Sequence, residues 1–314
     1  MAEFLMKPKI DFAFKEIMMD EKARIGFLAA VLHLDPKDVK EARILNPYLR
    51  KVHEDDKLGI LDVRILMNND AVIDVEIQLS ELLVWPDRSL FYAAKMYTDQ
   101  IEQGQKYDVL KKCVSISILD FALFKKEADF YSCFHIREDT RGFLYTDKME
   151  FHVIELPKLP LELKEECTGL ELWAKFINAE RKEEFDMIAG RDPYIDSAYQ
   201  QLQVISQDKQ KRMEYEAREK AVRDYNQGMY EAEERGRKEG RKEGRKEGRK
   251  EVIQMFIEMG QEYGLDDAAI LKRLQEKAEL SPEEAAAYLE EYSSQHRLIL
   301  DPEKIYQCVN KEKF

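Results

Sequence analysis

Two apolar runs separated by three turn-forming residues constrain the fold of this chain more than any other feature. Residues 58–67 (LGILDVRILM) and 71–79 (AVIDVEIQL) have the composition of β-strands, and Asn68, Asn69 and Asp70 lie between them. Asn and Asp tolerate the left-handed backbone of tight turns, so this pattern predicts a β-hairpin.

The segments around this hairpin predict a mixture of helices and strands. Apolar residues recur at helical spacings over residues 12–32, and a second helical pattern covers residues 87–103. Residues 114–121 (VSISILDF) and 151–156 (FHVIEL) are short apolar runs typical of strands. The order helix, hairpin, helix, strand favours an α/β fold with helices flanking a mixed sheet, and it disfavours a helical bundle.

The helix predicted after the hairpin has two distinct faces. We expect Asp87 to cap its start and Gly104 to end it. Its predicted apolar face consists of Leu90, Ala94, Tyr97 and Ile101. A polar stripe consists of Arg88, Tyr92, Lys95 and Asp99. This stripe either holds phosphates of a nucleic acid or is a solvated, charge-balanced face.

The hairpin carries carboxylates that are the first candidates for chemistry. Asp74, Glu76 and Gln78 alternate with apolar residues and therefore share one face of the second strand. A three-residue loop places Asp62 of the first strand directly opposite Glu76, with Cβ atoms about 5 Å apart. A two-residue loop would put these two carboxylates on opposite faces.

The repulsion between two carboxylates at this separation can be relieved in two ways. A divalent cation can bind both, and oxygen ligands favour Mg²⁺ or Mn²⁺. Such an ion can polarise a phosphodiester and activate a water molecule as the nucleophile. Alternatively, the charged residues of the two strands form plain cross-strand ion pairs. The residues concerned are Asp62, Arg64, Asp74 and Glu76.

Charge limits the classes of partner. The chain has 50 Lys and Arg residues against 63 Asp and Glu residues, a formal net charge of −13. Bulk charge therefore does not favour coating of nucleic acid, and contact with DNA needs a local basic surface or bridging metal ions. No apolar run approaches the length of a membrane span, and the first residues do not resemble a signal peptide. We therefore expect a cytoplasmic protein.

Cysteine and histidine give no recognisable ligand pattern. The four cysteines are far apart and include no CxxC pair, which argues against a disulfide framework or a zinc ribbon. The five histidines share no ligand spacing, and Cys133-x-His135 is interpreted as strand packing.

Several short segments, taken in order, resemble a known family. They are residues 11–15 (DFAFK), 60–63 (ILDV), 75–78 (VEIQ), 88–107, 115–121 and 154–158. In this order they resemble the Rpn family of recombination-promoting nucleases, which are PD-(D/E)XK family transposases. The resemblance spans roughly residues 7–230 and adds little about the remainder.

The resemblance implies a metal-dependent DNA endonuclease with a PD-(D/E)XK, restriction-endonuclease-like fold, in which Asp62 and Glu76 ligate Mg²⁺ or Mn²⁺. The lysine of the superfamily motif is replaced by Gln78. An amide carries no charge but can orient a water molecule. The missing positive charge would come from Lys57, Arg88 or Lys95. Asp11 and Tyr92 are accessory candidates, and the spacing of Asp11 and Lys15 is also that of a plain helical ion pair.

A four-residue repeat dominates the C-terminal part. Gly236, Gly240, Gly244 and Gly248 recur every four residues within the sequence RKEG. On a helix they form a ridge of small residues that allows a close-packed dimer, whereas their low helix propensity favours a flexible linker. Residues 237–250 contain eight basic residues against three glutamates, and this local excess can contact DNA.

These patterns predict four segments and two functions of different class. We expect a nuclease core over residues 1–160, a helical part of the same family region over 161–235, the repeat over 236–251, and a small helical tail over 252–314. The first functional hypothesis is a Mg²⁺-dependent DNA endonuclease linked to recombination or mobile elements. The alternative is a nuclease-fold module that binds DNA or another partner without efficient cleavage.

Overall fold

The computed structural model describes residues 4–47, 62–82 and 84–299, with side chains described through residue 294. The chain divides into two compact units, Met1–Asn226 and Gln227–Phe314. Each unit has a hydrophobic core of its own.

The described part of the first unit contains a six-stranded mixed sheet with strand order β1-β2-β3-β4-β6-β5. Its strands are β1 (Ala42–Ile44), β2 (Val63–Met67), β3 (Ala71–Gln78), β4 (Lys112–Leu119), β5 (Tyr131–Arg137) and β6 (Leu144–Glu155). The central pairs β3–β4 and β4–β6 are parallel, and the outer pairs are antiparallel. The prediction of a mixed α/β sheet flanked by helices is therefore confirmed.

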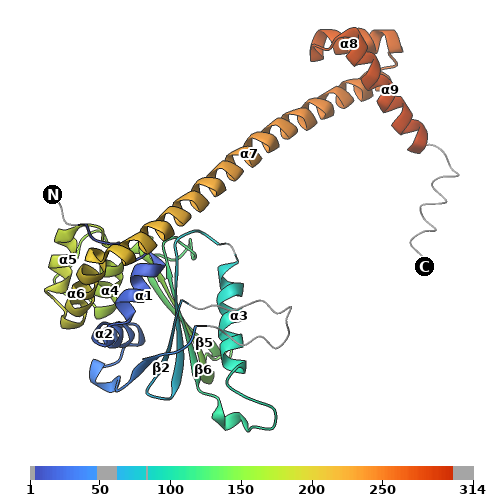
Figure 1. Ribbon diagram of the computed structural model, residues 1–314. Coiled ribbons are helices and arrows are strands. Elements are labelled where there is room, and N and C mark those ends of the chain that lie inside the picture. Colours follow the sequence, from blue (N-terminus) through green and yellow to red (C-terminus); the bar gives the residue numbers. More distant parts are fainter. Residues whose placement is uncertain (1–3, 48–61, 83, 300–314) are drawn as a thin grey trace. The chain divides into compact units, whose positions relative to one another are not determined.

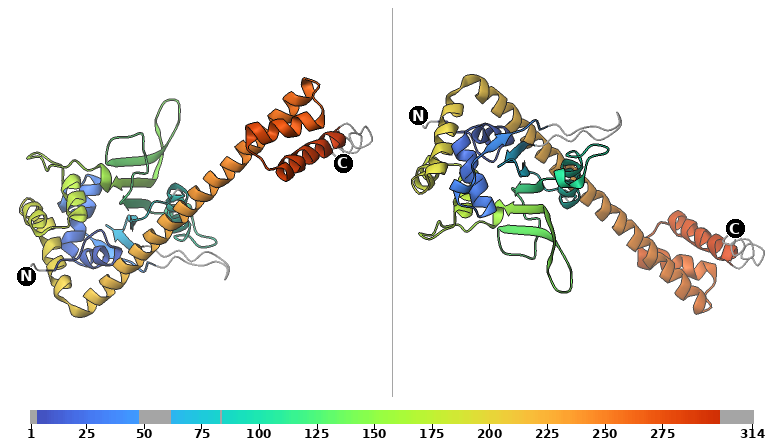
Figure 2. Two further views of the ribbon diagram at one scale, coloured as in Figure 1. Left: turned by 90° about the horizontal axis from the view of Figure 1, so that it is seen from above. Right: turned by 90° about the horizontal axis from the view of Figure 1, so that it is seen from below.

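Helices cover the two faces of this sheet unequally (Figures 1 and 2). One face packs on a group of helices: α1 (Asp11–Met18), α2 (Glu21–Leu32), α4 (Gly169–Asn178), α5 (Lys182–Ala189) and α6 (Pro193–Gln207). This main core includes the apolar residues of β3, Ile73, Val75 and Ile77, which alternate with the polar ones. The opposite face packs on α3 (Trp85–Thr98) through Met96. The polar residues of β3 therefore face α3.

The predicted hairpin is confirmed together with its register. Asn68 and Asn69 have φ values of 49° and 54°, the left-handed conformation that Asn accepts more readily than most residues. Met67 pairs with Ala71, and the antiparallel ladder continues to the pair Val63 and Val75. The loop therefore has three residues, and the face assignment that depends on it holds.

The helix after the hairpin differs from the prediction in its ends and its rotation. It starts at Trp85, with Pro86 in the first turn, where a proline fits because that backbone position has no helical partner. Asp87 therefore lies within the helix and does not cap it, and the helix ends well before Gly104. The predicted apolar face is wrong, because Leu90 is 53% exposed while Ala93 and Met96 are buried. The same rotation turns Arg88 toward the sheet.

The strand prediction was incomplete. β4 covers nearly the whole predicted run of residues 114–121, but residues 151–156 form only the end of the long strand β6. Strand β1, which has three residues, was not predicted. Cys133-x-His135 was interpreted as strand packing, but the range of β5 was not predicted, because it is an edge strand with exposed apolar residues such as Phe134 and Ile136.

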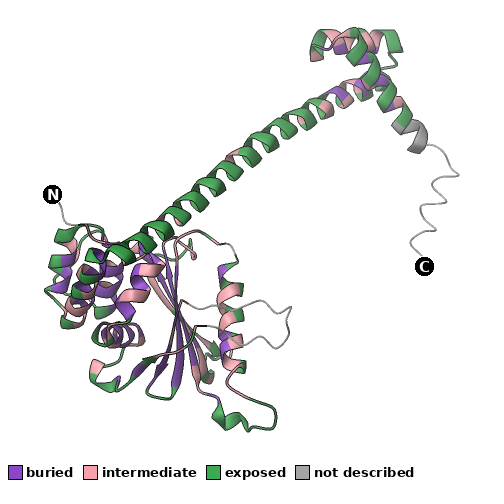
Figure 3. Cartoon of the chain, viewed as in Figure 1, coloured by how far each residue is buried: buried purple, intermediate pink, exposed green. Residues whose placement is uncertain are grey.

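In the second unit, the repeat is helical. It lies within α7 (Lys209–Glu262), whose residues around the repeat are largely exposed (Figure 3). Ile253 and Ile257 of α7 pack on α8 (Asp267–Ala278) and α9 (Pro282–Ile299). Among the described residues, no helix combines the length and apolar character needed to cross a bilayer.

Candidate functional site

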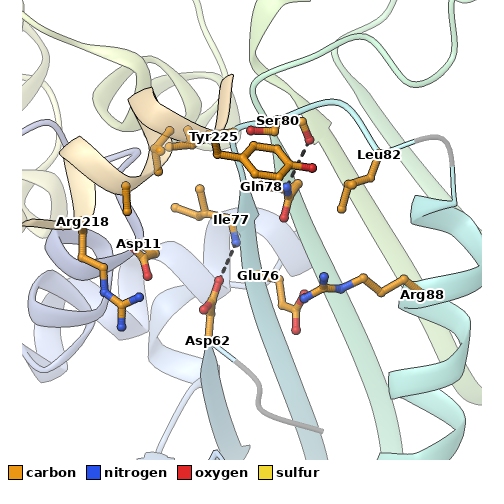
Figure 4. A pocket seen from close by; sticks show the side chains of 13 residues that line it. Asp11, Asp62, Glu76, Ile77, Gln78, Ser80, Leu82, Arg88, Arg218 and Tyr225 are labelled. Carbon is orange, nitrogen blue, oxygen red and sulfur yellow. Dashed lines mark hydrogen bonds and ion pairs between the residues drawn. The ribbon is translucent and has the colours of Figure 1, made fainter. Parts of the chain in front are cut away.

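A cavity of about 470 Å³ lies where the hairpin, α1, α3 and α7 meet within the first unit (Figure 4). The hairpin contributes Asp62, Glu76 and Gln78, which were predicted to act together. Asp11 of α1 and Arg88 of α3 also line the cavity. The structure thus brings together five residues that were predicted from the sequence.

Asp62 and Glu76 both line the cavity at one end of the hairpin. Asp62 directly precedes β2, one position beyond the last strand pair, Val63 and Val75, and Glu76 follows Val75 on β3. The Asp62 carboxylate accepts a hydrogen bond through Oδ2 from the Ile77 amide, at 3.2 Å. This bond fixes the Asp62 side chain beside the strand that carries Glu76, as Figure 4 shows.

Glu76 is a buried carboxylate with incomplete pairing. The residue is only 6% exposed, and its Oε1 has no hydrogen-bond partner among the described residues. Among the cations that the structure describes, Arg88 lies near this carboxylate, with its Nη2 3.8 Å from Oε2. Burial, and next the charge of Asp62, raise the pKa of Glu76 to about 7.

A second cation lies at the other carboxylate. Nζ of Lys15, on α1, is 2.9 Å from Oδ1 of Asp62 and 3.9 Å from Oδ2 of Asp11. The predicted Asp11–Lys15 helical pair is therefore present, but Lys15 lies closer to Asp62. Lys15 was not predicted as a site residue, although it lies one helical turn after Asp11 and ends the segment 11–15 that resembles the family.

Arg88 is held in place by aromatic side chains. Its guanidinium carbon lies 5.6 Å from the ring centroid of Trp85 and 5.3 Å from that of Tyr92. Tyr92 itself packs against a buried apolar cluster that includes Met96. Tyr92 therefore positions Arg88, and both residues of the predicted polar stripe face the sheet.

The other predicted cations do not join this site. Lys95 lies two turns beyond Arg88 on α3, and the cavity walls formed by described residues do not include it. Lys57 lies outside the described residues. Arg218 of α7 does line the cavity, but it is 142 positions from Glu76 and carried no signal in the sequence.

Gln78 lies on the same face of β3 and lines the cavity. Its Nε2 donates a hydrogen bond to the carbonyl oxygen of Ser80, at 3.1 Å. The Ser80 hydroxyl in turn hydrogen-bonds Oδ1 of Asn226 on α7, at 2.6 Å. This chain of contacts fixes the Gln78 side chain at the cavity wall.

The alternative of plain cross-strand ion pairs does not describe the hairpin. Arg64 and Asp74 are directly opposed, yet within the described part of the chain they form no ion pair within 4 Å. Oδ1 of Asp74 and Nε of Arg64 are both buried without hydrogen-bond partners there. Burial, followed by the charges of Glu76 and Asp62, raises the pKa of Asp74 well above its usual range.

These features fit a divalent cation. Asp62 and Glu76 both offer carboxylate oxygens to the cavity, and Oε1 of Glu76 is buried with no partner in the described part of the chain. A hard cation coordinated by oxygen, such as Mg²⁺ or Mn²⁺, would supply the missing positive charge. Without the ion, Lys15 and Arg88 neutralise part of the negative charge of the two carboxylates.

Comparison with known proteins identifies the family of the chain. The family described as PD-(D/E)XK nuclease family transposase matches residues 8–232 of the chain, which include the whole sheet and every described residue of the cavity. PD-(D/E)XK nucleases generally use divalent metal ions. No curated protein and no solved structure matches the chain significantly.

Proposed function

Because the chain belongs to the PD-(D/E)XK nuclease family of transposases, we propose that it is a metal-dependent DNA endonuclease that works in recombination or on mobile elements. The observation that supports this most is the buried Oε1 of Glu76, which has no hydrogen-bond partner among the described residues and lies beside a second carboxylate, Asp62. A protein that only binds DNA gains nothing from holding two crowded carboxylates in one cavity.

In this proposal Asp62 and Glu76 hold Mg²⁺ or Mn²⁺. When bound, the cation supplies Lewis-acid polarisation of a phosphoryl oxygen and a source of hydroxide at neutral pH. The raised pKa of Glu76 means that ion binding competes with a proton on this carboxylate.

The remaining cavity residues act on water and on the phosphates. Gln78 orients the attacking water through its amide, whose position is fixed by Ser80. Lys15 and Arg88 stabilise the negative charge that develops on the phosphate, and Arg218 binds a flanking phosphate. We propose that Lys95 and Lys57 contact DNA farther from the cavity.

The second candidate function is a module that keeps the nuclease fold and binds DNA or a partner without efficient cleavage. Gln78 supports it, because a neutral amide replaces the lysine of the superfamily motif. The two proposals differ in metal binding. A nuclease binds Mg²⁺ through Asp62 and Glu76, whereas a pure binding module has no Mg²⁺ site that depends on them.

Nicking of supercoiled plasmid tests the proposal. We expect nicking with Mg²⁺ or Mn²⁺, none with a chelator, and loss by at least about 10³-fold in Asp62→Ala and in Glu76→Ala. Asp70→Ala is the matched control, since Asp70 is an exposed acid in the same hairpin. Undiminished nicking by both active-site variants would refute the assignment. Bound but uncut DNA would favour the second candidate.

A further inference from the structure

A second group of ligand-type side chains lies on the β5–β6 hairpin. Cys133 pairs with His152, and His135 pairs with Glu150, in the antiparallel register of β5 and β6. We call these four residues the β5–β6 cluster. Residues two apart on a strand share a face, so all four side chains project from the same side of the sheet.

This side is opposite to the one that carries Asp62 and Glu76. Glu76 aligns with Ser117 of β4, and Ser117 aligns with Val153 of β6, so Val153 shares the face of Glu76. His152, as the neighbour of Val153, projects from the other face. The β5–β6 cluster is therefore separate from the candidate nuclease site.

Strand pairing thus reveals what the sequence spacing did not. The histidines showed no common ligand spacing, and Cys133-x-His135 was interpreted as packing. The pairing of β5 with β6 brings in Glu150 and His152 from a different segment, so the interpretation as packing alone is incomplete.

The distances within the cluster suit one shared ion. One ligand atom each from Cys133, Glu150 and His152 lie within 4.8 Å of one another. Nε2 of His152 is 2.6 Å from Oε1 of Glu150, and Nε2 of His135 is 3.2 Å from Oε2. Zinc bonds are about 2.0–2.3 Å long, so ligand atoms around one tetrahedral ion lie about 3.3–3.8 Å apart. Small side-chain adjustments therefore complete such a site.

The surroundings orient His152 as a ligand. The residue is 1% exposed, and its Nδ1 lies 2.7 Å from the Tyr131 hydroxyl, which lies 3.4 Å from the Val31 carbonyl oxygen. Without metal, Nε2–H donates to Glu150 and Nδ1 accepts from the Tyr131 hydroxyl. A metal at Nε2 would require the proton on Nδ1, which can then donate to the Tyr131 oxygen while the Tyr131 hydroxyl donates to Val31. Such outer hydrogen bonds orient histidine ligands in metal sites.

Glu150 offers its carboxylate as a third ligand. The residue is buried, and its Oε1 lies 2.6 Å from Nε2 of His152. Lys112 and His135 approach the same carboxylate. Without metal, these groups form an ion-pair network, and an ion bound to Cys133 and His152 would replace part of it.

We propose that Cys133, Glu150 and His152 form a binding site for a zinc-class transition metal ion, with His135 beside its open position. A thiolate and an imidazole select Zn²⁺ over Mg²⁺, whereas the oxygen ligands of Asp62 and Glu76 favour Mg²⁺ or Mn²⁺. On binding, the Cys133 thiol gives up its proton to solvent, and the thiolate sulfur bonds to the metal.

The position of the site suggests a structural role. β5 is an edge strand, and its pairing with β6 becomes irregular directly after His135. A metal bound at the last regular pairs fixes the edge strand to the sheet. We therefore expect zinc to raise the melting temperature of the protein, because an ion that binds only the folded state stabilises it.

Metal analysis of untagged, chelator-stripped protein tests the proposal. We expect one Zn²⁺ per chain in the presence of excess Mg²⁺, and a thiolate-to-metal charge-transfer band when Co²⁺ replaces Zn²⁺. Cys133→Ser, a change at an exposed residue, is expected to abolish the band and the zinc-dependent rise in melting temperature. Tyr131→Phe should weaken zinc binding about 10–100-fold.

Two controls separate this site from the other parts of the molecule. Cys167→Ser changes a half-buried cysteine outside the cluster and should leave zinc binding unchanged. The double variant Asp62→Ala, Glu76→Ala should also retain zinc, so failure of the nuclease proposal leaves this test intact. Equal zinc binding by wild type and Cys133→Ser, absence of zinc binding by the wild type, or loss of zinc in either control would overturn the proposal.

Discussion

The ammonium group of Lys15 lies 2.9 Å from Oδ1 of Asp62, so one of the two proposed metal ligands is paired with a cation from the first helix. The Lys15 and Asp62 side chains are 33% and 23% exposed. Pairs with this much contact with water contribute less than about 1 kcal/mol to stability. The position of Lys15 beside the candidate metal site therefore suggests a role in function more than in folding.

We expect Lys15→Met to reduce the rate of plasmid nicking by about 100-fold, because it removes a positive charge that stabilises the reacting phosphate. The free energy of unfolding should change by less than about 1 kcal/mol. Lys22→Met, at an exposed position of α2, is the matched control. A variant that nicks plasmid at the wild-type rate would show that Lys15 only balances the charge of Asp62.

The buried carboxylate of Glu76 predicts a pH-dependent stability of the metal-free protein. Its pKa is raised from 4.5 to about 7, so the folded state binds more protons than the unfolded state between these values. The free energy of unfolding should therefore fall as pH rises through this interval, in total by on the order of 3 kcal/mol. Urea denaturation at pH 5 and pH 8 with a chelator measures this difference.

Glu76→Gln supplies the control for this pH dependence. The amide does not titrate, so the variant should lose most of the decline and be more stable than the wild type at pH 8. Mg²⁺ should reduce the decline in the wild type, because it binds the ionised carboxylate. An unchanged pH dependence in Glu76→Gln would assign the effect to another group, of which Asp74 is the first candidate.

The sequence alone predicted those features that depend on residues close to one another in the chain. The left-handed turn at Asn68 and Asn69 set the hairpin register, and this brought Asp62 and Glu76 to the same cavity. The rotation of α3 was not predictable in this way, because a helix with apolar residues on several sides has no unique buried face. It depends on the sheet beneath it, where Glu76 attracts Arg88.

Contacts between segments that are far apart in the chain were also not predictable from the sequence. Lys15 and Arg218 reach the site from helices at the two ends of the family region, and no spacing rule links them to the hairpin. The β5–β6 cluster depends in the same way on the pairing of two strands, and the exposed apolar residues of β5 gave no sign of its partner.

Substitutions of Gln78 test whether its amide has a catalytic role. Gln78→Leu keeps a similar volume but cannot orient water, so we expect nicking to fall about 10–100-fold with DNA affinity unchanged. Gln78→Lys restores the residue of the superfamily motif and should retain at least the wild-type rate. Equal rates for wild type and Gln78→Leu would mean that the amide serves only to hold Ser80.

Arg218 is expected to contact a phosphate of the DNA. Its removal in Arg218→Ala should weaken binding to all DNA sequences alike and reduce the slope of log affinity against log salt by about one. Fluorescence anisotropy over a salt series measures this slope. Lys220→Ala is the control, since Lys220 is exposed on the same helix but is not among the residues that line the cavity. The same change in slope for both variants would indicate a general effect of charge.

The glycine repeat predicts a gain in stability when the glycines are replaced. A Cβ atom added at Gly236, Gly240, Gly244 or Gly248 meets no heavy atom within 4 Å among the described residues. Each Gly→Ala change on an exposed helix favours the helix by about 1 kcal/mol, so the quadruple variant should show more helix by circular dichroism and melt at a higher temperature.

Gly260→Ala is the matched control on the same helix. A Cβ atom there would lie 2.8 Å from Cγ1 of Ile270, so this change should lower the melting temperature. Sedimentation velocity of the quadruple variant separates the two interpretations of the repeat. An unchanged oligomeric state means that the glycines are not packed against another chain. Loss of a wild-type dimer would identify them as the ridge through which two copies associate.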